Sequence, residues 1–295
     1  MIGTIVKALS GFYYVRIRER ESSASRVYRC RARGVLKKDG ISPLVGDEAE
    51  IDILDDDDGV VTAILPRRNS FVRPAVANID LFVATVAAHD PEPHLETLDR
   101  FLAVAEAASA DAIVCVNKID LGSADFLVGV YDGIYDTLPV SAGTGEGMDA
   151  LKAALAAKRS AFAGPSGVGK SSIINFLLRD GVIETGGVSR KTGRGRHTTR
   201  HVEIFRTDFG AELFDTPGYT SFDGATVEPE EVGSLFPEIA RLSAGCRFDD
   251  CMHLFEPNCA VRDAASEGNI TGSRYSSYLR MLDEAIVDRR KGTSN

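Results

Sequence analysis

Residues 164–171 have the composition and spacing of a loop that binds nucleotide phosphates. They form Gly-Pro-Ser-Gly-Val-Gly-Lys-Ser and fit the pattern G-x-x-x-x-G-K-[ST]. The glycines let backbone N–H groups converge on phosphate oxygens, the lysine contacts the β- and γ-phosphates, and the last hydroxyl binds Mg²⁺. A strand-like run precedes the loop and a helix-like run follows it. The predicted phosphate-binding residues are Gly164, Pro165, Ser166, Gly167, Val168, Gly169, Lys170, Ser171 and Ser172.

Two short motifs that precede this loop indicate a guanine nucleotide. Asn117, Lys118 and Asp120 follow the strand-like run AIVCV, and Ser141 and Ala142 end another such run. A carboxylate at position 120 can accept hydrogen bonds from N1–H and the 2-amino group of guanine, which adenine does not offer. Leaving that carboxylate unpaired would disfavour ATP by roughly a few kcal/mol. The backbone at 141–142 can donate to guanine O6.

A further motif, Asp-Thr-Pro-Gly at 215–218, has the form D-x-x-G and also follows a strand-like run. Asp215 would hold Mg²⁺ through a water molecule, and the N–H of Gly218 would contact the γ-phosphate. In ordinary P-loop GTPases the phosphate loop comes first, whereas here the base-recognition motifs precede it. The sequence therefore predicts a circularly permuted GTPase. In this arrangement the segment after Gly218 leads directly into the C-terminal region and can pass on a nucleotide-dependent movement.

A basic, glycine-rich segment before the D-x-x-G motif supplies the remaining candidates for catalysis. Mg²⁺ needs a threonine from this segment when GTP is bound, and Thr199 is preferred over Thr198. Tyr219 stands where Ras-like enzymes carry the glutamine that orients the attacking water, so we expect slow intrinsic hydrolysis. His197 is the nearest alternative for orienting water, and a contact with phosphate or RNA is an equal alternative. The predicted catalytic residues are thus His197, Lys170 and Thr199.

Three cysteines and one histidine near the C-terminus have the spacing of a metal site. Cys246, Cys251, His253 and Cys259 lie within 14 residues. Thiolates and imidazole together favour tetrahedral Zn²⁺, and four protein ligands leave no open position for catalysis. We therefore expect one structural zinc ion per chain, with unligated thiols as the alternative. Such grouping is typical of metal binding in a reducing compartment rather than of a disulfide framework.

The local patterns that must position these motifs divide the chain into three parts. Residues 1–66 form about five short alternating runs separated by Gly and Ser turns, which predicts a small β-barrel. From residue 79 strand-like and helix-like runs alternate, which predicts a parallel sheet with helices on both faces. Beyond about residue 230 the periodicity is lost until a closing amphipathic helix. The expected elements include helices over 94–108, 148–158 and 275–290 and a hairpin of two strands over 201–207 and 211–216.

Charge is distributed unevenly along a chain whose net charge is −9. Residues 16–38 carry nine Lys and Arg against two acids, and residues 186–206 carry six against one. Two basic segments on an acidic chain suggest focused contact with a polyanion such as RNA. For either segment alone a solvated surface of mixed charge is the favoured alternative. Tyr13, Tyr14 and Tyr28 accompany the first segment and could stack on bases, but packing is favoured for at least two of them.

The remaining composition indicates an ordinary soluble protein. Apolar residues make up 44% of the chain, and no apolar run approaches the roughly 20 residues that a membrane span needs. The N-terminus predicts an amphipathic strand rather than a signal peptide. We expect a cytoplasmic monomer that binds no membrane. Cys30 and Cys115 stand apart from the metal group and are expected to be buried free thiols.

These motifs and their order resemble the RsgA (YjeQ) family, the ribosome small-subunit-dependent GTPases. The resemblance covers nearly the whole chain: a barrel, then NKID, VSA, GPSGVGKS, GRGRHTT and DTPG in the permuted order, then C-x₄-C-x-H-x₅-C. It implies an OB-fold at residues 1–68, a permuted α/β P-loop GTPase domain at 69–230 and a mainly α zinc domain at 231–295. It also implies that the small ribosomal subunit and its RNA are partners, and that the subunit stimulates hydrolysis of GTP to GDP.

Two other functions remain open on the sequence alone. A passive RNA-binding scaffold would use nucleotide only for structure, and Lys170→Ala would then leave its function intact. A nucleotide kinase or ATPase would bind ATP and GTP equally. An Asp120→Asn variant that kept its preference for GTP would favour that second alternative.

Overall fold

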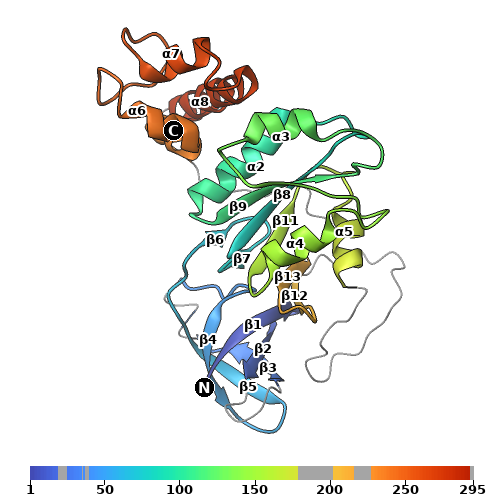
Figure 1. Ribbon diagram of the computed structural model, residues 1–295. Coiled ribbons are helices and arrows are strands. Elements are labelled where there is room, and N and C mark those ends of the chain that lie inside the picture. Colours follow the sequence, from blue (N-terminus) through green and yellow to red (C-terminus); the bar gives the residue numbers. More distant parts are fainter. Residues whose placement is uncertain (19–24, 35, 37–39, 179–201, 216–226, 293–295) are drawn as a thin grey trace. The chain divides into compact units, whose positions relative to one another are not determined.

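The structure is a computed structural model that describes residues 1–18, 25–34, 36, 40–178, 202–215 and 227–292 (Figure 1). The described residues form two compact units. The first draws on 1–81, 152–161 and 173–219, and the second on 82–151, 162–172 and 220–295. Both units are discontinuous in sequence because the chain passes between them more than once. The predicted boundaries at residues 68 and 230 stay predictions.

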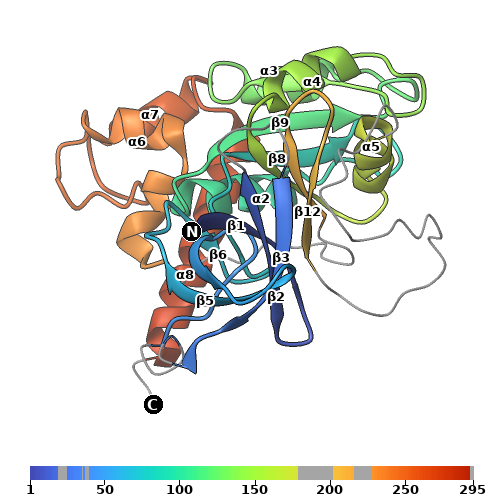
Figure 2. The ribbon, with the colours of Figure 1, turned by 90° about the horizontal axis from the view of Figure 1, so that it is seen from below.

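The first unit begins with a five-stranded barrel, drawn in blue in Figures 1 and 2. Its strands are β1 (Ile2–Leu9), β2 (Phe12–Arg18), β3 (Ser25–Ala32), β4 (Glu48–Ile53) and β5 (Asp58–Ile64). Neighbours pair antiparallel except β3 with β5, and an additional antiparallel pairing of β1 with β4 closes the barrel. The barrel predicted from the alternating runs is confirmed.

Alternate side chains of the five strands fill the barrel interior. Ile5, Val15, Cys30, Ile51 and Val61 come one from each strand, and none is more than 1% exposed. Because side chains in a strand point to opposite faces in turn, such alternation is what a small closed barrel requires. The sequence pattern thus determines which face of each strand is buried.

Three further strands extend the sheet of the first unit beyond the barrel. β12 (Glu203–Arg206) and β13 (Glu212–Asp215) form the predicted antiparallel hairpin, and β11 (Arg159–Ala163) runs parallel to β13. β12 also pairs with β1, so the order is β11-β13-β12-β1-β2-β3-β5-β4. A separate short pair, β6 (Ser70–Phe71) with β7 (Val76–Ala77), was not predicted because two residues carry no periodicity.

The second unit contains β8 (Leu81–Ala87), β9 (Asp111–Asn117) and β10 (Thr137–Pro139) in the order β10-β9-β8. Every residue of β8 is buried, as in a strand covered on both faces. The predicted helices are present as α2 (Leu95–Ala107) and α4 (Met148–Leu155), and α5 (Lys170–Leu177) follows the phosphate loop. α3 (Asp125–Tyr131) was not predicted, since its short run contains Gly and β-branched Val, which are weak helix formers.

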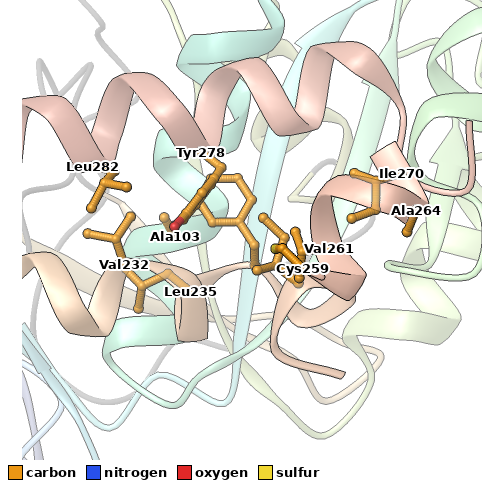
Figure 3. Close-up of a cluster of buried hydrophobic side chains, with 11 residues drawn as sticks. Ala103, Val232, Leu235, Cys259, Val261, Ala264, Ile270, Tyr278 and Leu282 are labelled. Carbon is orange, nitrogen blue, oxygen red and sulfur yellow. The ribbon is translucent and has the colours of Figure 1, made fainter. Parts of the chain in front are cut away.

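Four helical segments close the second unit: η1 (Pro229–Leu235), α6 (Pro237–Ser243), α7 (Ala260–Ser266) and α8 (Gly272–Gly292). They share a core in which Val232, Leu235, Val261 and Leu282 pack together with Ala103 of α2 (Figure 3). The predicted closing helix is confirmed as α8. η1, α6 and α7 were missed because each spans only seven residues, which is too short to show a helical period.

The two cysteines outside the C-terminal group are buried, as expected. Burial raises the pKa of the Cys30 thiol to about 11 and that of Cys115 to about 12. Both therefore remain protonated and unreactive near neutral pH.

Among the described residues, no helix combines the length and the apolar composition that crossing a bilayer demands.

Candidate functional site

The phosphate loop lies between β11 and α5, the strand–loop–helix context that its motif requires (Figure 1). Two of its glycines are needed by close backbone approaches. A Cβ on Gly164 would lie 2.2 Å from the carbonyl oxygen of Thr85, and a Cβ on Gly169 would lie 2.2 Å from Nδ2 of Asn117. Both glycines also have positive φ, which other residues rarely adopt. The observed conformation of the loop therefore requires glycine at positions 164 and 169.

Lys170 at the start of α5 turns back over the loop. Its ammonium donates to the carbonyl oxygens of Gly164 at 2.5 Å and Pro165 at 2.8 Å. Partial burial lowers the pKa of Lys170. The hydroxyl-bearing residues Ser166, Ser171 and Ser172 are exposed beside it. The loop thus presents one positively charged side chain and three exposed serines.

Asn117 joins the base-recognition motif to the phosphate loop. It ends β9 and is 2% exposed. Its Nδ2 donates to the carbonyl oxygen of Val168 at 2.8 Å, and its Oδ1 accepts from the N–H of Ala142 at 3.1 Å. One buried amide therefore ties together three segments that are separate in the sequence, and all three carry predicted nucleotide-binding residues.

Asp120 and Ser141 form the second connection within the base-recognition region. The Ser141 hydroxyl donates to Asp120 Oδ1 at 2.5 Å and accepts from the N–H of Thr144 at 3.1 Å. Ser141 is fully buried, whereas Asp120 is exposed. The carboxylate is thus oriented by a fixed hydroxyl while the residue stays exposed, which leaves it able to accept hydrogen bonds from a base.

The loop after β8 borders the same region, and sequence reasoning missed it. The Lys118 ammonium donates to the carbonyl oxygen of Asp90, and Pro91 Cδ lies 3.6 Å from where a Cβ on Gly167 would stand. Ala88 N–H donates to the carbonyl oxygen of Asn117 at 2.7 Å. The position of this loop at the carboxyl end of a buried strand was the available signal, since loops there meet at one edge of a parallel sheet.

Several predicted site residues cannot be placed relative to this region. His197, Thr198, Thr199, Gly218 and Tyr219 lie outside the described residues. Asp215 ends β13 in the first unit, and its side chain is not among those described. The assignments of Mg²⁺ ligands and of a water-orienting residue therefore stay predictions.

Cys246, Cys251, His253 and Cys259 come together as predicted. Their four ligand atoms lie within 4.8 Å of one another. Cys246 Sγ is 3.8 Å from Cys259 Sγ, and His253 Nδ1 is 3.5 Å and 3.3 Å from these two sulfurs. With Zn–S near 2.3 Å and Zn–N near 2.0 Å, a tetrahedral ion separates its sulfurs by about 3.8 Å and sulfur from nitrogen by about 3.5 Å. The donor set and its spacing fit Zn²⁺.

Helix α8 and one glutamate hold the cysteine-rich loop in shape. The hydroxyls of Tyr275 and Tyr278 donate to the carbonyl oxygens of His253 and Met252 at 2.7 Å and 2.6 Å. The Glu256 carboxylate accepts from three backbone N–H groups of the same loop at 2.8–3.0 Å. Burial lowers the pKa of His253, which favours the neutral imidazole that a metal ligand requires.

Arginines of the basic segment at residues 16–38 form ion pairs with acids of the barrel, which the composition of the segment alone did not suggest. Arg29 binds Asp58 at 2.7 Å and Arg33 lies 3.6 Å from Asp52, so acids that follow later in the barrel offset part of this charge. Tyr28 packs in the barrel core. Arg31 lies 4.8 Å from the ring of Phe12, and after Arg29 its charge also helps to lower the pKa of Asp58. Fewer positive charges of residues 16–38 are therefore available to a polyanion than the count of Lys and Arg in this segment suggests.

The comparisons with known proteins agree with a GTPase region and with a separate N-terminal domain. Residues 64–225 match the family described as RsgA GTPase, and residues 2–61 match the one described as RsgA N-terminal domain. A protein of Caldanaerobacter subterraneus named "Small ribosomal subunit biogenesis GTPase RsgA" is 44% identical over 99% of this chain and 98% of its own length. A protein of the same name from Bacillus velezensis is 40% identical over 98% of both.

Two solved structures have the same fold. The structure titled "The crystal structure of YloQ, a circularly permuted GTPase" is 33% identical and aligns with a TM-score of 0.80 over 98% of this chain and 95% of its own. YjeQ from Thermotoga maritima is 32% identical, with a TM-score of 0.81 over 97% and 98%. The permuted order inferred from the motifs is thereby confirmed.

Proposed function

This chain belongs to the RsgA family of GTPases, and from that premise we propose that it binds the small ribosomal subunit and acts in its late maturation. It hydrolyses GTP to GDP and phosphate, and the subunit stimulates that reaction. The main structural support is the buried side-chain amide of Asn117, which forms hydrogen bonds with Val168 of the phosphate loop and with Ala142 of the base-recognition region. These two hydrogen bonds support a single site that binds both the phosphates and guanine.

Guanine specificity rests on Asp120, with Lys118 lying beside the base. The orientation imposed by the Ser141 hydroxyl supports this role, because the carboxylate is held before a base arrives. The backbone of Ser141 and Ala142 donates to guanine O6. The phosphates are bound by residues 164–172, with Lys170 contacting the β- and γ-phosphates.

Mg²⁺ accompanies GTP and is held by Ser171 and by Thr199, with Asp215 acting through water. The metal neutralises charge on the β- and γ-phosphates. His197 orients the attacking water, with an RNA contact as the equal alternative. Because Tyr219 replaces the water-orienting glutamine of Ras-like enzymes, the intrinsic rate is slow and depends on a partner.

The cluster of Cys246, Cys251, His253 and Cys259 holds one structural Zn²⁺ per chain. Three thiolates and one imidazole occupy all four positions of a tetrahedral ion, so the metal stabilises the C-terminal region and takes no part in hydrolysis. Support comes from the match between the observed ligand spacings and those of a tetrahedral site.

The barrel contacts ribosomal RNA through the basic surface of its second and third strands. Arg31 beside Phe12 offers a guanidinium and an aromatic face, the chemistry that single-stranded RNA uses in stacking and phosphate contacts. We place the domains at residues 1–68, 69–230 and 231–295. The protein acts in the cytoplasm as a monomer.

A multiple-turnover GTPase assay with and without purified small ribosomal subunits tests this proposal. We expect slow hydrolysis by the protein alone and strong stimulation by small subunits, but not by large subunits or by tRNA. Lys170→Ala should abolish both rates. Equal stimulation by tRNA, or none by small subunits, would refute the proposed partner while leaving the assignment as a GTPase intact.

A further inference from the structure

Residues 88–94 connect β8 to α2 and contact both of the predicted nucleotide-binding regions of the second unit. We call them the Asp90 loop. The Lys118 ammonium donates to the main-chain carbonyl oxygen of Asp90. Pro91 Cδ lies 3.6 Å from where a Cβ on Gly167 would stand, so the proline ring lies against the phosphate loop. One loop outside the recognised motifs thus contacts the base-recognition motif and the phosphate loop.

Buried neighbours hold the Asp90 loop at both ends. At its start the N–H of Ala88 donates to the carbonyl oxygen of Asn117 at 2.7 Å, and every residue of β8 before it is buried. At its end α2 follows, and Leu98 and Asp99 in the first part of that helix are buried. The carbonyl group of Asp90 is therefore presented by a loop that is anchored on both sides.

The two residues joined by this hydrogen bond both have a left-handed backbone. φ is 46° at Asp90 and 65° at Lys118. Residues other than glycine rarely adopt such values, although aspartate and asparagine do so more readily than β-branched residues. Conformations of this kind persist only where the surroundings impose them, and they cluster at ligand-binding sites. The geometry of the contact thus depends on which residue types stand at these two positions.

The contact with Asp90 also orders a long side chain before a nucleotide binds. A lysine side chain has many rotamers and loses conformational entropy when it is fixed in one of them. A base that had to order this side chain itself would bind more weakly by that cost. Because the acceptor is a neutral carbonyl, the ammonium of Lys118 is held in place without being neutralised.

We propose that Asp90 is a positioning residue that holds Lys118 beside the guanine base through its main-chain carbonyl oxygen. The hydrocarbon stem of Lys118 then packs on the purine ring, while Asp120 selects guanine. The inference rests on the proposed function, in which Lys118 lies beside the base, and it adds a residue that belongs to none of the motifs. Since the contact is made by the main chain, the conformation of residue 90 matters and its side-chain charge does not.

Substitutions that differ in their tolerance of positive φ test the proposal. Asp90→Val cannot keep this conformation without strain, so the carbonyl should move and the Kd for GDP should rise about fivefold. Asp90→Asn and Asp90→Gly adopt positive φ readily and should restore the Kd to within about twofold of the wild-type value. Competition against fluorescent GDP, normalised to the fraction of protein that binds at saturation, measures these values.

Inosine diphosphate (IDP) separates this role from base selection. IDP has the purine ring of GDP but lacks the 2-amino group that Asp120 is expected to bind. In Asp90→Val the Kd for IDP should therefore rise by the same factor as the Kd for GDP. A loss confined to GDP would overturn the proposal, and so would an equal loss in Asp90→Asn and Asp90→Val.

The matched control is Ser109→Val, which places the same strain at the other end of α2. Ser109 follows that helix, is exposed and has φ of 52°. This variant should be destabilised in thermal melts as Asp90→Val is, since both place a β-branched residue at positive φ. Its Kd for GDP should stay at the wild-type value. A rise in Kd equal to that of Asp90→Val would show a general effect of lost stability and overturn the proposal.

A double-mutant cycle with Lys118→Met tests whether Asp90 acts through Lys118. Methionine keeps most of the hydrocarbon stem but lacks the ammonium that the carbonyl of Asp90 holds. We expect Lys118→Met to weaken GDP binding, and Asp90→Val to cause no further loss in that background. Additive losses would overturn the proposal. If the wild-type protein bound ADP as tightly as GDP, the proposed guanine recognition would fail, whereas the cycle would still decide whether Asp90 positions Lys118.

Discussion

Arg274 of α8 and Asp99 of α2 form an ion pair that water does not reach. Their atoms Nη1 and Oδ1 are 2.8 Å apart, and their side chains are 1% and 0% exposed. Glu238 of α6 accepts two further hydrogen bonds from the guanidinium at 2.8 Å and 3.0 Å. Phe236 lies under the guanidinium at 4.6 Å, and the Tyr131 hydroxyl donates to Asp99 at 2.8 Å. One arginine therefore holds three helices of the second unit together.

Replacing Arg274 with methionine should lower the free energy of unfolding by about 3–5 kcal/mol, because it leaves two buried carboxylates without a counter-charge. Chemical denaturation followed by circular dichroism measures the change. The matched control is Arg280→Met, which removes an exposed ion pair between the same two helices. Its effect should be near zero. Equal effects of the two variants would contradict the role assigned to Arg274.

The raised pKa of Glu106 should make the free energy of unfolding depend on pH. Desolvation by burial raises its pKa above the ordinary 4.5, and this outweighs the hydrogen bond from the Tyr135 hydroxyl. Because the folded-state pKa lies above the unfolded value, the stability that Glu106 contributes is fully present below the unfolded pKa. It is lost as pH rises through the folded-state pKa.

The matching variant is Glu106→Gln, which stays neutral and can still accept the hydrogen bond of Tyr135. It should melt at a higher temperature than the wild-type protein near pH 7, and the difference should shrink as pH falls toward 4.5. Thermal melts of both proteins across this range measure it. If the difference in melting temperature between the two proteins did not change with pH, the pKa of Glu106 would not be raised.

Asp120→Asn should change base preference rather than abolish nucleotide binding. An amide at this position donates where the carboxylate only accepts, so the 2-amino group of guanine loses its acceptor and the 2-carbonyl of xanthine gains a donor. We expect affinity for GDP to fall about a hundredfold and affinity for XDP to rise, consistent with the cost of an unpaired polar group. Competition against fluorescent GDP measures both. A variant that kept its preference for guanine would contradict the role of Asp120.

Metal content tests the cysteine-rich site. Carefully purified protein should contain about one Zn²⁺ per chain, and Cys259→Ser should lose it and melt at a lower temperature. The control is Cys30→Ser, whose thiol lies in the barrel core and should leave the metal content unchanged. Wild-type protein without metal would remove the zinc assignment.

Local chemistry explains why the motifs expected at the nucleotide site can be recognised in the sequence. The phosphate loop and the D-x-x-G motif are recognised because their function needs particular residues at fixed short spacing, as do the four ligands at 246–259. The barrel strands and α2 were predictable from periodicity, since one buried face imposes a repeat on the sequence. The seven-residue helices α6 and α7 were not, because they are shorter than the window in which a period can be seen.

What the sequence by itself determined is the family and its expected chemistry: a phosphate-loop motif at 164–171, a predicted guanine contact at Asp120, and four residues whose types and spacing suit zinc. Only the tertiary structure decided which charged side chains are buried and which residues they pair with. Arg16 belongs to a basic run like its neighbours, yet it pairs with Glu212, 196 residues away. Arg274 pairs with Asp99 across 175 residues. A charge in a sequence looks the same whether it is solvated or buried, and only the closing of strands and helices around it removes the water and selects its partner.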